Sequence, residues 1–173
     1  MKMFKTIAAA IALIAVPASA SLPTGAKAPA FATQAAKAGK PFAFNLRSAL
    51  AKGPVVLYFY PKAFTQGCTL EANAFAEAMP QFKAAGASVI GMSNDDIATL
   101  KRFSREECRD AFPVGVAGPK VIGAYDVAMG SSGLTSRTSY VIAPGGRIVA
   151  VHSNSDYRGH VEKTLAAVRA LKK

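Results

Sequence analysis

The chain has few residues from which a metal centre could be built. Its 173 residues include two histidines and two cysteines. His152 and His160 flank Asp156, a spacing that could supply ligands only through a bend, whereas structural zinc sites take four ligands. The pattern favours two surface histidines near a helix cap that Asp156 provides. No glycine-rich phosphate loop is present either. The sequence therefore predicts neither a metal site nor a cofactor.

Acidic residues are scarce. Ten Asp and Glu stand against 21 Lys and Arg, which gives a formal net charge of +11. Such an excess of positive charge can bind nucleic acid, an anionic membrane surface or an acidic partner. The basic residues are scattered, however, and no aromatic residues alternate with them as stacking on bases would need. We interpret the charge as a source of solubility and expect no nucleic-acid binding.

The apolar run near the N-terminus is short. It covers residues 6–16, well below the roughly 20 residues that a membrane span needs. Two lysines precede it and small residues ending at Ala20 follow it, which is the order of a cleavable signal peptide. Residues 1–20 are therefore predicted to be a signal peptide, with no stable membrane insertion after cleavage. Residues 21–173 would form one domain, exported to a bacterial periplasm.

Apolar strands alternate with amphipathic helices along the rest of the chain. Residues 54–60 are a continuous β-branched and aromatic run, which is typical of a strand buried on both faces. Residues 65–85 show helical spacing, with Pro80 expected to kink the helix or to start a second segment. The other expected elements are an irregular leader (21–40), strands over 41–46, 87–92, 112–116, 139–143 and 147–151, and helices from Asn94 or Asp95, over 120–125 and from Asp156. This order predicts an α/β fold with a mixed central sheet and helices on both faces.

One cysteine stands where a strand gives way to a helix. Cys68 follows the buried strand and a short loop, and it lies at the start of the helix over 65–85. Unpaired backbone N–H groups and the positive end of the helix dipole favour the thiolate there, and the thiolate is the reactive form. The placement predicts a chemically active thiol. Cys108 lies in a charged stretch, so both thiols are expected to be accessible.

The two cysteines also allow two other interpretations. An exported protein with two cysteines most often carries one structural disulfide. A non-enzymatic domain stapled by Cys68 and Cys108 is therefore one alternative. A thioredoxin-like disulfide exchanger fits less well, because Cys68 has no second cysteine at Cys-x-x-Cys spacing. Thioredoxins also carry a substrate-binding proline directly before the corresponding strand, and no proline stands directly before the strand that begins at Ser139.

Residues 58–71 read YFYPKAFTQGCTLE. Within them, Pro61-x-x-x-Thr65-x-x-Cys68 resembles the active-site signature of peroxiredoxins. The flanking residues look like the bacterioferritin-comigratory (PrxQ) branch, although Gln66 stands where that branch usually has proline. The resemblance implies a thioredoxin-like fold and makes Cys68 the peroxidatic cysteine. Pro61 and Thr65 would then shape its pocket, and the Thr65 hydroxyl could hydrogen-bond the thiolate or the peroxide.

The same resemblance implies a supporting cation. Arg137 matches the arginine that peroxiredoxins place before the hairpin strand, where a permanent charge favours the thiolate and donates hydrogen bonds to the transition state. Glu71, one helical turn after Cys68, would orient it. Each residue also has a simpler interpretation. Arg137 could be a solvated arginine at a strand edge, and Glu71 an acid favoured by the helix dipole.

Turnover requires a second thiol to condense with the Cys68 sulfenic acid. In much of the branch this thiol lies five residues later, where this chain has Asn73, but other members place it on the following helix, where Cys108 falls. The resemblance thus implies a thiol peroxidase for hydrogen peroxide and organic hydroperoxides. Cys108 would close an intramolecular disulfide, and a thioredoxin-type or small-thiol reductant would open it. A one-cysteine enzyme with an idle Cys108 stays open. The branch is often monomeric, so we expect a monomer.

Overall fold

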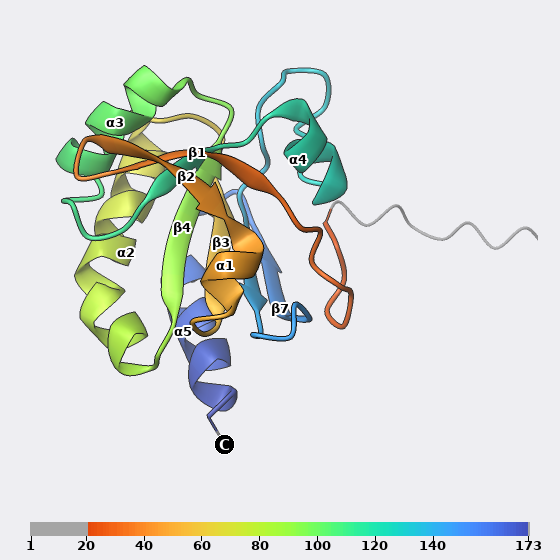
Figure 1. The fold of residues 1–173 in the computed structure, drawn as a ribbon. Coiled ribbons are helices and arrows are strands. Elements are labelled where there is room, and N and C mark those ends of the chain that lie inside the picture. Colours follow the sequence, from red (N-terminus) through yellow and green to blue (C-terminus); the bar gives the residue numbers. More distant parts are fainter. Residues whose placement is uncertain (1–20, 173) are drawn as a thin grey trace, which may run out of the picture.

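A computed structural model describes residues 21–172, which are built around a seven-stranded sheet in the order β2-β1-β5-β4-β3-β6-β7 (Figure 1). β3, β4 and β5 are parallel, and every other neighbouring pair is antiparallel. The predicted signal peptide lies outside the described residues. Within them, no helix is long and apolar enough to cross a membrane. The strands are β1 (Ala32–Lys37), β2 (Lys40–Asn45), β3 (Val55–Phe59), β4 (Ser88–Ser93), β5 (Val114–Val116), β6 (Thr138–Ile142) and β7 (Ile148–Ser153).

Helices cover both faces of the sheet (Figure 1). One apolar cluster includes side chains of α2, α3 and α5, and a second includes side chains of α1 and α4. Along β3, Val56 and Tyr58 belong to the first cluster, whereas Val55 and Leu57 belong to the second. The predictions of a mixed sheet between helices and of a central strand buried on both faces are confirmed. The helices are α1 (Leu46–Leu50), α2 (Gln66–Ala84), α3 (Ile97–Glu106), α4 (Pro119–Ala124) and α5 (His160–Ala170).

The leader expected to be irregular contains strand β1, which corrects that prediction. β1 pairs antiparallel with both β2 and β5. Its sequence, ATQAAK, is poor in β-branched and aromatic residues, so strand propensity does not indicate it. The strand is held by its hairpin instead. Ala38 and Gly39, at φ 51° and 74°, form a two-residue connection to β2 in the backbone region that such tight turns use.

The buried face of α2 differs from the expected one. The helical spacing of the apolar residues over 65–85 includes Leu70 and so predicts it in the core, but Leu70 is 43% exposed, whereas Cys68, Glu71 and Phe75 are buried. Residues three or four apart share a helix face, so the inward face that carries Phe75 also carries Cys68 and Glu71. Pro80 is exposed and starts no second segment, because α2 continues through it to Ala84.

Helix α5 begins at His160, and Asp156 does not cap it. Gly159, at φ 89°, is the N-cap, while the Asp156 carboxylate binds the backbone and guanidinium of Arg158 in the preceding turn. His160 is completely buried, with its ring centroid 4.4 Å from that of half-buried His152. The expectation of two surface histidines is therefore wrong for His160. Residues 21–172 contain no group of three His, Cys, Asp or Glu that could hold a metal ion.

Candidate active site

Cys68 lies in the first turn of α2, just beyond the carboxyl end of β3. This end of parallel strands is where α/β sheets usually bind ligands. The thiol is 1% exposed and packs in the same apolar cluster as Ala72 and Phe75. The expectation of an accessible thiol is therefore wrong for the reduced protein, because the inward face of α2 carries Cys68 into the core.

Arg137 brings a positive charge to the sulfur of Cys68. Its Nη2 lies 3.5 Å from Cys68 Sγ and donates to it. The register of the sheet explains the approach, since β6 starts directly after Arg137 and Thr138 pairs with Phe59 at the end of β3. The side chain is 8% exposed, so the interpretation as a solvated edge arginine is wrong. A Cβ on Gly67 would lie 3.1 Å from Nη2, and the absence of a side chain there leaves room for the guanidinium.

Glu71 is the ion-pair partner of Arg137. Nη1 of the guanidinium donates to Oε2 of Glu71, whose side chain is completely buried. Burial raises the pKa of Glu71 to about 8, whereas the charge and hydrogen bond of Arg137 act to lower it. Arg137 is thus the group that favours the ionised form of Glu71 against the effect of burial, and Glu71 is not the exposed first-turn acid of the simpler interpretation. Its second oxygen, Oε1, has no hydrogen-bond partner.

The loop after β7 holds the remaining nitrogen of the guanidinium. Nε of Arg137 donates to the carbonyl of Ser155 at 3.0 Å, and the backbone N–H of Asn154 donates to the carbonyl of Arg137 at 3.1 Å. The three guanidinium nitrogens therefore contact three different groups: a loop carbonyl, the Glu71 carboxylate and the Cys68 sulfur. This arrangement fixes both the position and the plane of the cation.

Thr65 and Pro61 lie in the loop that precedes α2. Thr65 is the N-cap residue of α2 and is exposed, and its hydroxyl donates to the carbonyl of Lys62 at 2.9 Å. Pro61 is half-buried. Asp95, after β4, holds the same loop in place, because its carboxylate accepts a hydrogen bond of 2.8 Å from the N–H of Ala63. Because the Thr65 hydroxyl donates its hydrogen to the Lys62 carbonyl, its oxygen is left to accept a hydrogen bond from a peroxide. The roles of Pro61 and Thr65 in the pocket remain predictions.

Cys108 is a free thiol, as is Cys68, and it is completely buried. It follows the end of α3, and its N–H donates to the carbonyl of Phe103. Both cysteines belong to the same apolar cluster. Burial raises the pKa of the Cys108 thiol well above its usual value, and the charge of Glu107 adds to this. The expectation of an accessible Cys108 is wrong, because its charged neighbours face outwards while its own side chain turns into the core.

The segment around Cys108 is held to α2 by side chains of the residues on either side of it. Asn73 donates to Oε2 of Glu107 at 3.1 Å, and Arg109 pairs with Oε1 of Glu77 at 3.2 Å. Arg109 and the residue after it, Asp110, have φ of 49° and 57°, a region that non-glycine residues rarely adopt. The segment thus combines an unfavourable backbone with contacts that hold it in place.

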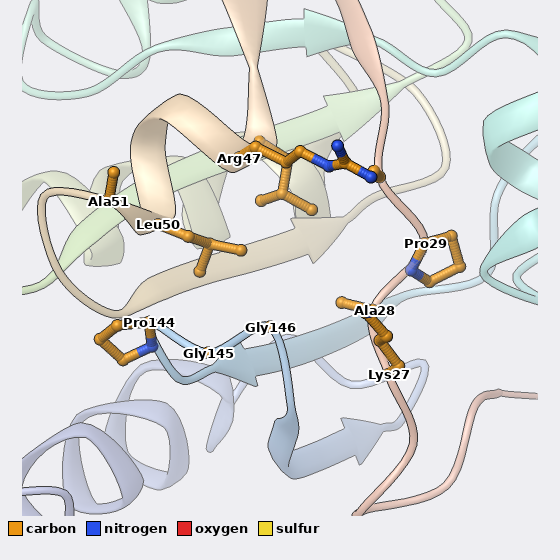
Figure 2. A pocket seen from close by; sticks show the side chains of 11 residues that line it. Lys27, Ala28, Pro29, Arg47, Leu50, Ala51, Pro144, Gly145 and Gly146 are labelled. Atoms are coloured by element: carbon orange, nitrogen blue, oxygen red, sulfur yellow. The ribbon is translucent and has the colours of Figure 1, made fainter.

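A separate cavity of about 540 Å³ lies at the other end of the sheet (Figure 2). Lys27 and Arg47 line it together with the turn formed by Pro144, Gly145 and Gly146. That turn follows β6, whose last residue, Ile142, pairs with the first residue of β3. The cavity is therefore at the opposite end of β3 from Cys68. None of the six predicted site residues lines it.

Sequence reasoning missed one polar group beside Cys68, Arg137 and Glu71, the imidazole of His160. Its Nδ1 lies 3.7 Å from Oε1 of Glu71 and 2.8 Å from the hydroxyl of Ser139. Only its position beside Gly159 at a helix start marks it in the sequence, and that position gives no sign of burial. The structure therefore brings together Cys68, Arg137 and Glu71, adds His160 behind them, and places Cys108 in the same cluster.

Comparisons with known proteins agree with this architecture. Residues 24–151 match the AhpC/TSA family. Chloroplastic peroxiredoxin Q of Oryza sativa subsp. japonica is 36% identical over 120 residues, which cover 68% of this chain and 55% of the rice protein. The chain thus spans about half the length of the curated plant relatives that it matches.

Solved structures share the fold at similar identity. Peroxidoxin BcpB of Mycobacterium tuberculosis has a TM-score of 0.75 and 33% identity, over 87% of this chain and 98% of that one. The bacterioferritin comigratory protein of Xanthomonas campestris has a TM-score of 0.71 and 31% identity, over 81% and 92%. The chain therefore has the thioredoxin-like fold of these proteins and belongs to the AhpC/TSA family, within its peroxiredoxin Q/Bcp branch.

Proposed function

We propose that the protein is a thiol peroxidase that reduces hydrogen peroxide and organic hydroperoxides with Cys68. The observation that carries the proposal is the 3.5 Å contact between Cys68 Sγ and Nη2 of Arg137, at the start of a helix. A cation and a helix N-terminus both favour the thiolate. Family membership supports the same chemistry, because the related bacterioferritin comigratory protein of Xanthomonas campestris is described as having alkyl peroxide reduction activity.

The reaction begins with the Cys68 thiolate and a hydroperoxide ROOH. The sulfur attacks the terminal oxygen, the S–O bond forms as the O–O bond breaks, and the sulfur is oxidised to sulfenic acid. The departing RO⁻ takes a proton and leaves as alcohol, or as water when the substrate is hydrogen peroxide. Arg137 is placed to stabilise the negative charge that moves from sulfur to oxygen. Glu71 holds the guanidinium in that position.

The second half of the cycle uses Cys108. Its thiolate attacks the sulfur of the sulfenic acid, hydroxide leaves and is protonated to water, and a Cys68–Cys108 disulfide forms. A thioredoxin-type or small-thiol reductant then supplies two electrons and two protons to restore both thiols. We further propose that the enzyme acts as a monomer in the bacterial periplasm, after cleavage of residues 1–20.

The burial of Cys108 sets a condition on this cycle. A buried thiol with a raised pKa is a poor nucleophile, so the segment after α3 must open before the disulfide can close. The same burial is the observation that favours the second candidate, a one-cysteine peroxidase in which Cys108 only fills the core. The left-handed backbone at Arg109 and Asp110 favours opening.

Arg137→Met is expected to slow the first oxidation of Cys68 by one to two orders of magnitude, the usual scale for loss of one transition-state donor. The pH at which this oxidation reaches half its maximal rate should move upwards, because the thiolate loses the adjacent cation. The measurement is a quenched-flow pH profile with alkylation and mass spectrometry. Arg169→Met is the matched control, since it also removes one positive charge but from a contact with Gln81. Equal oxidation rates for Arg137→Met and the control would show that Arg137 takes no part in the chemistry and has only a structural role.

Removing the contacts between α2 and the Cys108 segment is expected to speed disulfide closure. Asn73→Ala combined with Glu77→Ala deletes both contacts, and surface pairs of this kind justify an increase of about threefold to fivefold. The measurement is the rate of disulfide formation after one equivalent of peroxide. Glu106→Gln, which breaks only the pair with Arg102 on α3, is the control. Unchanged closure in the double variant would show that the segment opens elsewhere or not at all.

A further inference from the structure

We propose that His160 is a positioning residue for Arg137, acting through the loop that follows β7. The inference rests on the proposed peroxidase and adds to it a residue outside the Pro-Thr-Cys motif and its arginine. His160 is completely buried at the first position of α5 and contacts groups from three other parts of the fold. These are the Ser139 hydroxyl on β6, the Glu71 carboxylate on α2 and the carbonyl of Asn154 in the loop.

One contact of the ring places a hydrogen on Nε2. Nε2 lies 3.1 Å from the carbonyl oxygen of Asn154, which can only accept, so Nε2 carries the hydrogen. Burial lowers the pKa of His160 to about 4, against the hydrogen bond to Asn154, which acts to raise it, and the charges of His152, Arg137 and Lys163 act in the same direction as burial. The ring is therefore neutral near pH 7. Nδ1 then accepts from the Ser139 hydroxyl at 2.8 Å and offers no hydrogen to Glu71.

The loop links this ring to the guanidinium. Asn154 accepts from His160 through its carbonyl and donates its N–H to the carbonyl of Arg137. The next residue, Ser155, accepts from Nε of Arg137. Asn154 is thus held between His160 and Arg137, and the adjacent Ser155 contacts the guanidinium directly. Because Nη2 of the same guanidinium meets Cys68, a shift of the loop carries the cation away from the sulfur.

The position of His160 also explains the unpaired oxygen of Glu71. Oε1 faces Nδ1 at 3.7 Å, beyond hydrogen-bond distance, while Nδ1 is occupied by Ser139. Glu71 therefore has only Arg137 as a hydrogen-bonding partner among the described residues. A histidine that donated to Glu71 would compete with Arg137 for the carboxylate. The neutral tautomer leaves that pair intact.

Substitution separates the positioning role from a role in packing. His160→Leu removes the donor to Asn154, whereas His160→Gln retains an N–H near the position of Nε2. We expect His160→Leu to slow oxidation of Cys68 about tenfold and to move its pH midpoint upwards, since small displacements of a catalytic group cost such factors. His160→Gln should stay within about threefold of the wild type. Leu165→Ala, a core truncation on the same helix, should lower the melting temperature without moving the midpoint.

Two readouts keep this inference distinct from the proposed function. The first is alkylation of Cys68 by iodoacetamide against pH, which reports the thiolate without any peroxide. The second is the ¹⁵N spectrum of the wild-type histidine rings, which needs no variant to fold. Nε2–H with an unprotonated Nδ1 near pH 7 is expected for His160. The other tautomer, a ring that titrates like a solvent-exposed one, or an unshifted midpoint in His160→Leu would overturn the positioning role. Shifted alkylation without peroxide reduction by the wild type would overturn only the peroxidase.

Discussion

Cys68→Ser is expected to abolish peroxide reduction, with a loss of roughly three orders of magnitude or more. A serine hydroxyl stays protonated near neutral pH even beside a cation, so it cannot replace the thiolate as nucleophile. The fold should survive, because the new oxygen is close in size to sulfur and lies within reach of Nη2 of Arg137. A buried hydroxyl with a partner costs about 1 kcal/mol or less.

The measurement is peroxide consumption together with thermal unfolding by circular dichroism. The chain has no tryptophan, so oxidation is followed by quenching and mass spectrometry rather than by indole fluorescence. Cys108→Ser is the matched control for the first oxidation, since it also replaces one buried sulfur by oxygen. Peroxide reduction by Cys68→Ser within a few-fold of the wild type would remove Cys68 from the chemistry. Loss of the circular dichroism signal would instead assign the cysteine a structural role.

The sheet and its helices could be predicted largely from local patterns. The run from Val55 to Tyr60 is apolar at every position except its two tyrosine hydroxyls, and only a strand between two layers buries such a run. Strand β1 could not be predicted in this way, because pairing with β2 and β5 stabilises it and its own side chains do not. Local propensity carries no information on such a partner.

The site was predicted as far as its motif extends. The order of the elements places Arg137 directly before β6, and its pairing with β3 brings Arg137 to Cys68. Burial was the part that failed. A charged neighbourhood indicated an exposed Cys108, yet one inward-facing side chain can occur in any charged stretch that covers a core. His160 was missed for the same reason, since the partners that make its burial tolerable lie on other elements.

Cys108→Ser is expected to leave the first oxidation fast and to stop turnover with a thioredoxin-type reductant. Attack on the O–O bond uses Cys68 and Arg137, which the substitution does not touch. Recycling by a dithiol reductant requires a disulfide, which needs both sulfurs. Without closure the sulfenic acid persists, so a second peroxide should convert more Cys68 to sulfinic acid. Turnover and the mass of Cys68 after excess peroxide are the measurements.

The buried position makes a second variant necessary. A hydroxyl without a partner in an apolar cluster costs roughly 1–3 kcal/mol, so Cys108→Ser could lose activity by unfolding. Cys108→Ala removes the sulfur without adding a polar group and is the better test if the two variants differ. Both should behave alike if the missing disulfide is the cause. Full thioredoxin-dependent turnover in folded Cys108→Ala would show that the enzyme works with one cysteine, and the contacts that hold the segment to α2 would then serve stability alone.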